Sequence, residues 1–428
     1  MSRSPARPAP ASPRHAALRL IEGALSHRGG LEEALGQPAL LALEPRDRAF
    51  ARAVAMAALR HLGPIDRLLD KRLQREPPEP VRNILRLGLA QAFWLDSPDY
   101  AVVDSTVAMV PERLRGLVNA VMRRTLADGR PSEAAADLAP PWLLARWRSA
   151  YGEDAANAIA AQIVLEPATD LTLRDPNDPT LASELGGEAL SGGSLRVSRR
   201  GDLAEWPGYA EGRWWVQDAA AAIPARLLRV QPGETALDMC AAPGGKTLQL
   251  AAAGATVTAL DRSERRMRRI ASGLERTGLT AETIAVDARA WAQERSFDAV
   301  LLDAPCTSTG AFRRHPDVLW NVRPGDVAAL ATEQKGLLEV AARRVRPGGR
   351  LVYSVCSLEI EEGEAQITGF LAGHPDFRLE EIKVGEGGAS DASCRQEGWL
   401  RILPADIPGG MDGFFIARMV RSAQSASR

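Results

Sequence analysis

The sequence predicts a doubly wound α/β sheet in the C-terminal half of the chain and an all-helical domain in front of it. Residues 235–247 read as an apolar strand ending in Asp238, then a Pro-Gly-Gly turn, then Lys-Thr opening a helix. From about residue 230 onward strands alternate with helices, whereas residues 14–130 show only helical periodicity. Such alternation builds a parallel sheet covered on both faces, with a ligand crevice at the carboxyl ends of the strands.

Length and composition are those of a globular protein. The chain has 428 residues, 45% of them hydrophobic and 25% charged, with a net charge of −1. At about 150 residues each, this length suggests roughly three domains. The four cysteines show no C-x-x-C spacing and the five histidines are scattered, so no metal site is expected and a reducing cytoplasm fits. No apolar run reaches the roughly 18 residues of a membrane span, so no membrane contact is expected.

The N-terminal part is expected to be a short tail followed by helices. Residues 1–13 are rich in Pro, Ala and Arg and lack the apolar core of a signal peptide, which predicts a disordered tail. Residues 14–130 form the predicted helical domain, since residues such as Phe50, Val54 and Ala57 recur at helical spacing. Proline residues separate one helix from the next.

Residues 131–215 are expected to hold a linker and a small α+β subdomain. The linker is polar and contains Ala and Pro. Further on, short β-like segments at 171–174 and 195–197 alternate with turns rich in Gly and Asp. A helix at 219–228 then precedes the first strand of the large sheet, and the last domain is expected to span 216–428.

Acidic residues stand at four successive strand ends of the predicted sheet. Strands are expected near residues 235, 256, 283, 298 and 351. The acids that close the first four are Asp238, Asp261, Asp287 and Asp303. Any one of them could be a solvated acid or a helix N-cap, but four in succession are much harder to obtain by accident.

Two classes of ligand fit the glycine turn. Gly-Gly-Lys-Thr at 244–247 suggests the phosphate loop of an NTPase. Such a loop needs a glycine four residues before its Gly-Lys-Thr, where this chain has Ala241, and Pro243 has no N–H to aim at phosphate. S-adenosylmethionine, a nucleoside without phosphate, fits better. Asp261 could accept from its ribose hydroxyls, and Asp287 could meet its adenine.

Three motifs resemble those of the RNA cytosine-C5 methyltransferases. They are Asp-Met-Cys-Ala-Ala-Pro-Gly-Gly-Lys-Thr at 238–247, Leu-Leu-Asp-Ala-Pro-Cys-Thr-Ser-Thr-Gly at 301–310 and Leu-Val-Tyr-Ser-Val-Cys-Ser at 351–357. They occur in the order and spacing of that family. The resemblance implies a class I, Rossmann-like methyltransferase core that binds S-adenosylmethionine and is closed by an antiparallel strand near 409–418.

The N-terminal domain resembles the NusB-like RNA-binding domain that precedes the catalytic part in bacterial 16S rRNA members of this family. The similarity lies in residues 100–104 and 116–124. Arginines there could grip phosphates. The Arg-Arg-His-Pro-Asp that begins at Arg313 also resembles the family, and arginine can stack on bases or bind phosphates. The residues expected to contact RNA are Arg123, Arg124, Arg313, Arg314 and His315.

The chemistry implied by the resemblance requires a thiolate. Carbon 5 of cytosine is too weak a nucleophile to take a methyl group unaided, and addition of a thiolate to carbon 6 makes the ring an enamine that can. Cys306 and Cys356 both follow apolar strands, so from the residues alone either could attack. Pro305-Cys306 resembles the Pro-Cys of DNA cytosine methyltransferases. The RNA family instead assigns attack to Cys356 and product release to Cys306.

Asp303 and Lys246 complete the expected catalytic set. Asp303 lies three residues before Cys306, so one strand end and its loop can place both against one base, and Asp303 is expected to hydrogen-bond the N3/N4 edge of the cytosine. The resemblance implies that Lys246 also reaches the active site, where an ammonium would lower a thiol pKa. Cys240 is expected to pack rather than react, and Cys394 is given no role. The expected cofactor-binding residues are Cys240, Ala241, Ala242, Pro243, Gly244, Gly245, Lys246, Asp261, Arg266, Asp287 and Asp303.

The function predicted from the sequence is S-adenosylmethionine-dependent methylation of a cytosine in rRNA at carbon 5. The partner is expected to be RNA, 16S rRNA above all, and not DNA, and the protein is expected to act as a monomer in the cytoplasm. The target base has to be single-stranded or flipped, because pairing hides its carbon 6. Two alternatives stay open: a non-catalytic RNA-binding or ribosome assembly factor that kept the fold, and a methyltransferase acting on tRNA or 23S rRNA.

Overall fold

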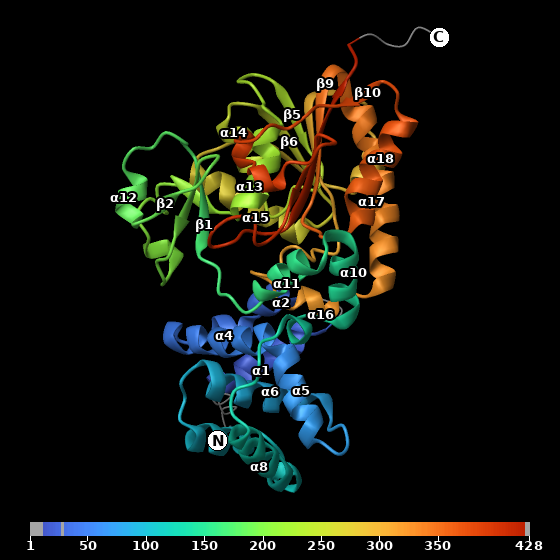
Figure 1. Ribbon diagram of the computed structural model, residues 1–428. Helices are drawn as coiled ribbons and strands as arrows, with labels where there is room; N and C mark the ends of the chain where they lie inside the picture. Colours follow the sequence, from blue (N-terminus) through green and yellow to red (C-terminus); the bar gives the residue numbers. More distant parts are fainter. Residues whose placement is uncertain (1–11, 27–29, 424–428) are drawn as a thin grey trace, which may run out of the picture. The chain divides into compact units, whose positions relative to one another are not determined.

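A computed structural model describes residues 12–26 and 30–423 and separates into two compact units (Figure 1). Unit 1 comprises the chain up to residue 165 together with 312–322. Unit 2 comprises 166–311 and the chain from 323 onward. Each unit has hydrophobic core clusters of its own.

Unit 1 is all-helical over its described residues, which confirms the predicted class of the N-terminal domain. Its helices are α1 (Pro13–Ala24), α2 (Gly30–Leu35), α3 (Pro38–Leu41), α4 (Pro45–Arg60), α5 (Leu62–Arg72), α6 (Glu79–Trp94), α7 (Asp99–Ala108), α8 (Glu112–Ala127), α9 (Ala135–Leu138), α10 (Pro141–Tyr151), α11 (Glu153–Ala161) and α16 (Val318–Asn321). The buried faces of α1, α4 and α6 meet in one core of small and branched aliphatic side chains.

Local sequence explains where several of these helices begin and how closely they pack. Pro13, Pro45 and Pro141 each occupy the first turn of a helix, where the missing N–H has no intrahelical partner to lose. α6 is buried along most of its length. Gly88 lets α7 approach it, because a Cβ at that position would lie 2.6 Å from Oγ1 of Thr106.

The first part of unit 2 is a four-stranded antiparallel sheet. Its elements are β1 (Thr169–Leu173), α12 (Leu181–Leu185), β2 (Glu188–Ala189), β3 (Ser194–Val197) and β4 (Trp214–Val216), with strand order β2-β3-β1-β4. The β-like segments expected at 171–174 and 195–197 correspond to β1 and β3. Arg196 donates from Nε to Oδ1 of the buried Asp170 at 2.7 Å. Asp170 Oδ2 accepts from the N–H of Ala219 at 3.1 Å, which ties this sheet to α13 (Ala219–Leu227).

The second part of unit 2 is an eight-stranded, mostly parallel sheet that confirms the predicted class I core. The strands are β5 (Thr235–Asp238), β6 (Thr256–Asp261), β7 (Glu282–Ala285), β8 (Phe297–Asp303), β9 (Val345–Val355), β10 (Phe377–Leu379), β11 (Leu400–Ile402) and β12 (Phe414–Arg421). The order is β10-β12-β9-β8-β5-β6-β7, with β11 paired to β12. β12 runs antiparallel to β9, as expected for the closing strand.

Helices cover both faces of this sheet. α13, α14 (Gly245–Ala252) and α15 (Glu264–Thr277) lie on one face, and α17 (Pro324–Arg344) and α18 (Glu364–Gly373) on the other (Figure 1). Alternate strand residues enter different cores: Val300 and Leu302 join the α17 side, and Leu301 joins the α13 side. Strands buried on both faces read as continuous apolar runs, and this is how β8 reads in the sequence.

The strand order places the predicted site. β5 has β6 on one side and β8 on the other, so the order of the parallel strands reverses there. In such sheets the ligand crevice lies outside the carboxyl ends of the strands at the reversal. The loops that follow β5, β6, β8 and β9 therefore gather at one edge.

The expected domain boundaries at 130/131 and 215/216 do not coincide with those of the two units. Helices α9 to α11 belong to unit 1, and so does the segment 312–322, which lies far along the sequence. Trp147 of α10 is fully buried and stacks on Phe312, with ring centres 6.1 Å apart. Local sequence patterns do not reveal such a pairing. Of the tail expected at 1–13, residues 1–11 lie outside the described part, and α1 already begins at Pro13.

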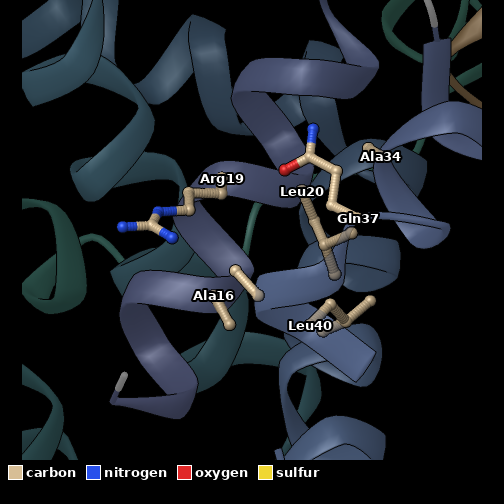
Figure 2. A pocket seen from close by; sticks show the side chains of 7 residues that line it. Ala16, Arg19, Leu20, Ala34, Gln37 and Leu40 are labelled. Atoms are coloured by element: carbon tan, nitrogen blue, oxygen red, sulfur yellow. The ribbon is translucent and has the colours of Figure 1, made fainter. Parts of the chain in front are cut away.

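A small hollow in unit 1 contains none of the expected catalytic residues. Figure 2 shows side chains from α1 and from the α2–α3 segment around it: Ala16, Arg19, Leu20, Ala34, Gln37 and Leu40. Across the described ranges 12–26 and 30–423, every helix is too short or too polar to cross a bilayer.

Candidate active site

The turn between β5 and α14 is built around a glycine. Gly244 has φ +111°, a backbone conformation that other residues rarely adopt, and a Cβ there would come within 3.1 Å of Ile270. α14 begins at the next residue. Thr247 of α14 donates from Oγ1 to Oδ2 of Asp238 at 2.7 Å, which ties the helix to the end of the strand.

Asp238 at the end of β5 is buried and only partly satisfied. Its Oδ1 has no hydrogen-bond partner among the described residues. Burial raises the pKa of Asp238 to about 7. A buried carboxylate oxygen without a donor is costly, and a ligand that brings an ammonium or hydroxyl group would remove that cost. The crevice therefore fits a cofactor that carries such donors.

Asp261, at the end of β6, and Asp287, shortly after β7, each accept hydrogen bonds from nearby groups. Asp261 accepts from the N–H of Ala242 at 3.2 Å and from that of Ser263 at 2.8 Å. Arg266 donates to the carbonyl oxygen of Ala242 at 2.5 Å, so its guanidinium lies over the glycine turn. Asp287 is paired with Arg289, and the hydrogen bond from this side chain lowers its pKa to about 2. Asp261, Asp287 and Arg266 remain predicted cofactor contacts.

The two expected catalytic cysteines lie side by side. Cys306 is in the loop after β8 and Cys356 directly follows β9, and their Sγ atoms are 3.5 Å apart. Ser308 lies beside both, with its Oγ 3.9 Å from Cys306 Sγ and 3.5 Å from Cys356 Sγ. The N–H of Gly310 donates to the carbonyl oxygen of Cys356 at 3.0 Å, which holds the two loops together.

The hydrogen bond between the thiols separates their acidities. Donation from Cys306 lowers the pKa of Cys356, against the effect of burial. The same hydrogen bond, together with burial, raises the pKa of Cys306 well above its ordinary value. Of the two sulfurs, Cys356 is therefore the one that forms a thiolate more readily. Burial raises the pKa of Cys240, so this thiol stays protonated, in line with the packing role expected for it.

Lys246 and Asp303 form an ion pair beside the cysteines. Nζ of Lys246 donates to Oδ2 of Asp303 at 2.6 Å, and Oδ1 of Asp303 accepts from Oγ of Ser354 at 2.8 Å. The ammonium also lies 5.5 Å from the ring centre of Phe414, within range of a cation–π interaction. Strand ends β8 and β9, helix α14 and strand β12 thus bring two thiols, a carboxylate and an ammonium to one place.

Sequence reasoning missed a buried acid that joins the two cysteine loops. Glu362, in the 3₁₀ turn η3 (Ile360–Glu362), is 0% exposed and accepts hydrogen bonds from residues of both cysteine loops. In the sequence it stands in the run Glu-Ile-Glu-Glu, which is typical of a solvated surface. Its position six residues after Cys356 is the feature of the sequence that could have indicated a place near the site.

The residues expected to contact RNA differ in their exposure to solvent. Arg123 and Arg124 are exposed on α8. Arg313 is 2% exposed, and this burial does not fit direct contact with RNA. The expectation followed from its place next to the Cys306 loop, but the segment 312–322 folds into unit 1, where the carbonyl oxygen of Arg313 accepts from Arg60 at 2.7 Å. Arg314 is half-buried.

His315 is expected to make the stability of unit 1 depend on pH. Its pKa is lowered to about 4, first by burial and then by Arg314 and Arg52. A histidine whose folded-state pKa lies below the ordinary 6.5 stabilises the fold above pH 6.5, and this contribution is lost as pH falls toward 4. A shift of that size corresponds to about 3 kcal/mol. Urea unfolding at pH 7 and pH 4.5 should therefore show a smaller acid loss for His315→Gln than for wild type. An equal loss in both proteins would contradict this.

Comparisons with known proteins find matching family models, related sequences and a similar solved structure. Residues 225–420 match the family model described as 16S rRNA methyltransferase RsmB/F, and residues 11–127 match the NusB family. The ribosomal RNA small subunit methyltransferase B of Sodalis glossinidius is 35% identical over 420 residues, covering 92% of this chain and 94% of that protein. The protein of the same name from Vibrio vulnificus is 33% identical and covers 96% and 99%. The crystal structure of PH0851 superposes with a TM-score of 0.78 at 25% identity, covering 97% of this chain and all of that one.

Proposed function

The chain belongs to the RsmB/F family of 16S rRNA methyltransferases, and on this premise we propose that it methylates a cytosine of 16S rRNA at carbon 5 through a covalent cysteine adduct. The observation that carries the proposal is the pair of sulfurs 3.5 Å apart, beside Lys246 and Asp303, at the carboxyl ends of β8 and β9. A single reactive thiol would be enough for the attack on carbon 6 but would leave the release step without a second group. Two adjacent thiols of unequal acidity suit a reaction in which a bond to sulfur forms and later breaks.

The first step is attack by Cys356. As the thiol of lower pKa, it supplies the thiolate that adds to carbon 6 of the cytosine, and the ring electrons move toward carbon 5 and N3. Asp303 hydrogen-bonds the N3/N4 edge of the base. Lys246, bonded to the same carboxylate, places a positive charge beside the ring, where negative charge develops.

S-adenosylmethionine, when bound, supplies the electrophilic methyl group that carbon 5 takes. The residues that would hold it surround the glycine turn. Asp238 would offer its unpartnered oxygen, Asp261 would accept from the ribose hydroxyls and Asp287 would meet the adenine. Arg266, which donates to the carbonyl oxygen of Ala242, and the backbone from Cys240 to Gly245 would line the cofactor site.

The last step is release, in which Cys306 takes part. In the resting pair its pKa is raised chiefly because it donates to the sulfur of Cys356. Once that sulfur is bonded to carbon 6 it no longer carries the charge, and the largest cause of the raised pKa of Cys306 is removed, while burial remains. Cys306 can then act in removing the proton from carbon 5, after which the S–C6 bond breaks and Cys356 leaves.

The test is methyl transfer by the purified full-length protein. With labelled S-adenosylmethionine and small-subunit rRNA, label should appear at carbon 5 of cytosine, at a position mapped by bisulfite sequencing. tRNA and 23S rRNA serve as competing substrates. Preferential labelling of either would show that this RNA, and not 16S rRNA, is the substrate. RNA binding without transfer of label would favour a non-catalytic assembly factor and contradict the proposal.

A further inference from the structure

A buried carboxylate that the mechanism above does not use joins the two cysteine loops. Oε1 of Glu362 accepts from the N–H of Thr307 at 3.0 Å. Its Oε2 accepts from Oγ1 of the same threonine and from Oγ of Ser357 at 2.5 Å. Thr307 directly follows Cys306, and Ser357 directly follows Cys356. One carboxylate thus binds the residue next to each sulfur.

Further hydrogen bonds fix the same loops. Nε2 of Gln334, a fully buried residue of α17, donates to Glu362 Oε1 and to the carbonyl oxygen of Pro305, both at 2.9 Å. The peptide groups on the two sides of Cys306 are therefore both held. The carbonyl oxygen of Glu362 accepts from the hydroxyl of Tyr353 at 2.6 Å, so the 3₁₀ turn is itself anchored to β9.

The carboxylate of Glu362 lies in an environment from which water is excluded, where an ionisable group is uncommon. Glu362 is 0% exposed, and its hydrogen-bond donors are hydroxyl, amide and backbone N–H groups, with no cation among those found in the described residues. Burial accordingly raises its pKa. A buried acid without a cationic partner is costly unless donors surround it. A carboxylate accepts at every lone pair, whereas the amide of a glutamine must turn two of its own N–H groups toward these donors.

We propose that Glu362 is a positioning residue of the cysteine pair: its carboxylate holds the loops after β8 and β9 so that the two sulfurs stay in hydrogen-bond contact. The proposal rests on the proposed function, in which both sulfurs act on one base. Glu362 touches neither sulfur and acts through Thr307 and Ser357.

If Glu362 has this role, its loss should change the pKa of Cys356, which can be measured. The groups that face this thiol are Cys306 and Ser308 from the loop after β8, Asp303 from the end of β8, and Asp412 from the segment before β12, while Lys246 of α14 neutralises Asp303. The hydrogen bonds with Cys306 and Ser308 lower the pKa of Cys356, and burial and the two carboxylates raise it. If the two loops move apart, Cys356 loses its hydrogen bond with Cys306 while the carboxylates of Asp303 and Asp412 remain near it. The pKa of Cys356 then rises.

The experiment compares Glu362→Gln with wild type in the full-length protein. The rate of alkylation of Cys356 by iodoacetamide is followed against pH, without RNA or cofactor, by mass spectrometry of its peptide. We expect the midpoint to rise by about one pH unit. At saturating 16S rRNA the rate of methyl transfer should fall about 10- to 100-fold, with little change in KM, because misplacement of reacting groups affects the chemical step.

The matched control is Asp376→Asn. It removes a carboxylate of the same unit that pairs with Arg421 at 2.9 Å, away from the cysteine loops, and should leave the alkylation midpoint at its wild-type value. If Glu362→Gln does not fold, Ser357→Ala removes one donor of the same network and should raise the midpoint by a smaller amount. An unchanged midpoint in whichever variant folds overturns the positioning role. Since alkylation needs no RNA, failure of the proposed function would show separately, as wild-type protein that transfers no methyl group.

Discussion

Replacing Cys356 by alanine is expected to lower methyl transfer to 16S rRNA by a factor on the order of 10⁴ or more, the scale on which removal of a catalytic nucleophile acts. The reason is that carbon 5 stays unreactive until a thiolate has added to carbon 6. The measurement is single-turnover transfer of label from S-adenosylmethionine. Binding of S-adenosylmethionine, followed by calorimetry, should stay within a few-fold of wild type, since the thiol lies after β9 and the glycine turn after β5.

Cys394→Ala is the matched control for this result. Cys394 is a partly buried thiol of the same unit that stands near β11 and has no expected role. Its replacement should leave the rate of transfer near that of wild type. Substantial activity of Cys356→Ala would show that another group attacks carbon 6.

Replacing Cys306 by alanine is expected to trap the enzyme on its RNA. Attack by Cys356 and methyl transfer need no second sulfur, whereas release does, so a covalent protein–RNA adduct should accumulate. Multiple turnover should fall by roughly 10²- to 10³-fold, the scale of a lost proton-transfer group. A denaturing gel of protein mixed with labelled 16S rRNA and S-adenosylmethionine would show the adduct as a band of reduced mobility.

The adduct has its own control. The double variant, in which Cys306 and Cys356 are both alanine, lacks the attacking sulfur and should give no band. A band that appears with Cys356→Ala and is absent with Cys306→Ala would reverse the two roles. This outcome would agree with the Pro-Cys pattern of DNA cytosine methyltransferases and not with that of the RNA family.

Most of the large sheet could be predicted because its strands carry their own signals. β8 is an apolar run that ends in Asp303, and β5 ends in Asp238 before a glycine turn, so composition and turn chemistry mark both ends. Parallel strands share one carboxyl edge, and this topological rule alone brings the loops of Cys306 and Cys356 together. The proximity of the two sulfurs follows from the fold class once that class is recognised.

The rest depended on contacts between distant parts of the chain. The segment 312–322 reads as an extension of the Cys306 loop, but Phe312 packs on Trp147, more than 160 residues earlier, and the segment joins unit 1. The burial of Arg313 could not be predicted for the same reason. Glu362 stands in an acidic run that is typical of a surface, and only the tertiary fold places it against Thr307 and Ser357. Local pattern carries no information on which acid of such a run is buried.

In the proposed reaction Cys356 bonds to carbon 6 of the target cytosine and Cys306 acts on release. The most direct test is to trap the adduct with Cys306→Ala, digest protein and RNA, and sequence the modified peptide by mass spectrometry. We expect a single cytidine adduct that is bonded to the sulfur of Cys356 and carries one additional methyl group. A nucleotide attached to any other side chain, or a methylated RNA product formed at the wild-type rate with no adduct, would contradict it.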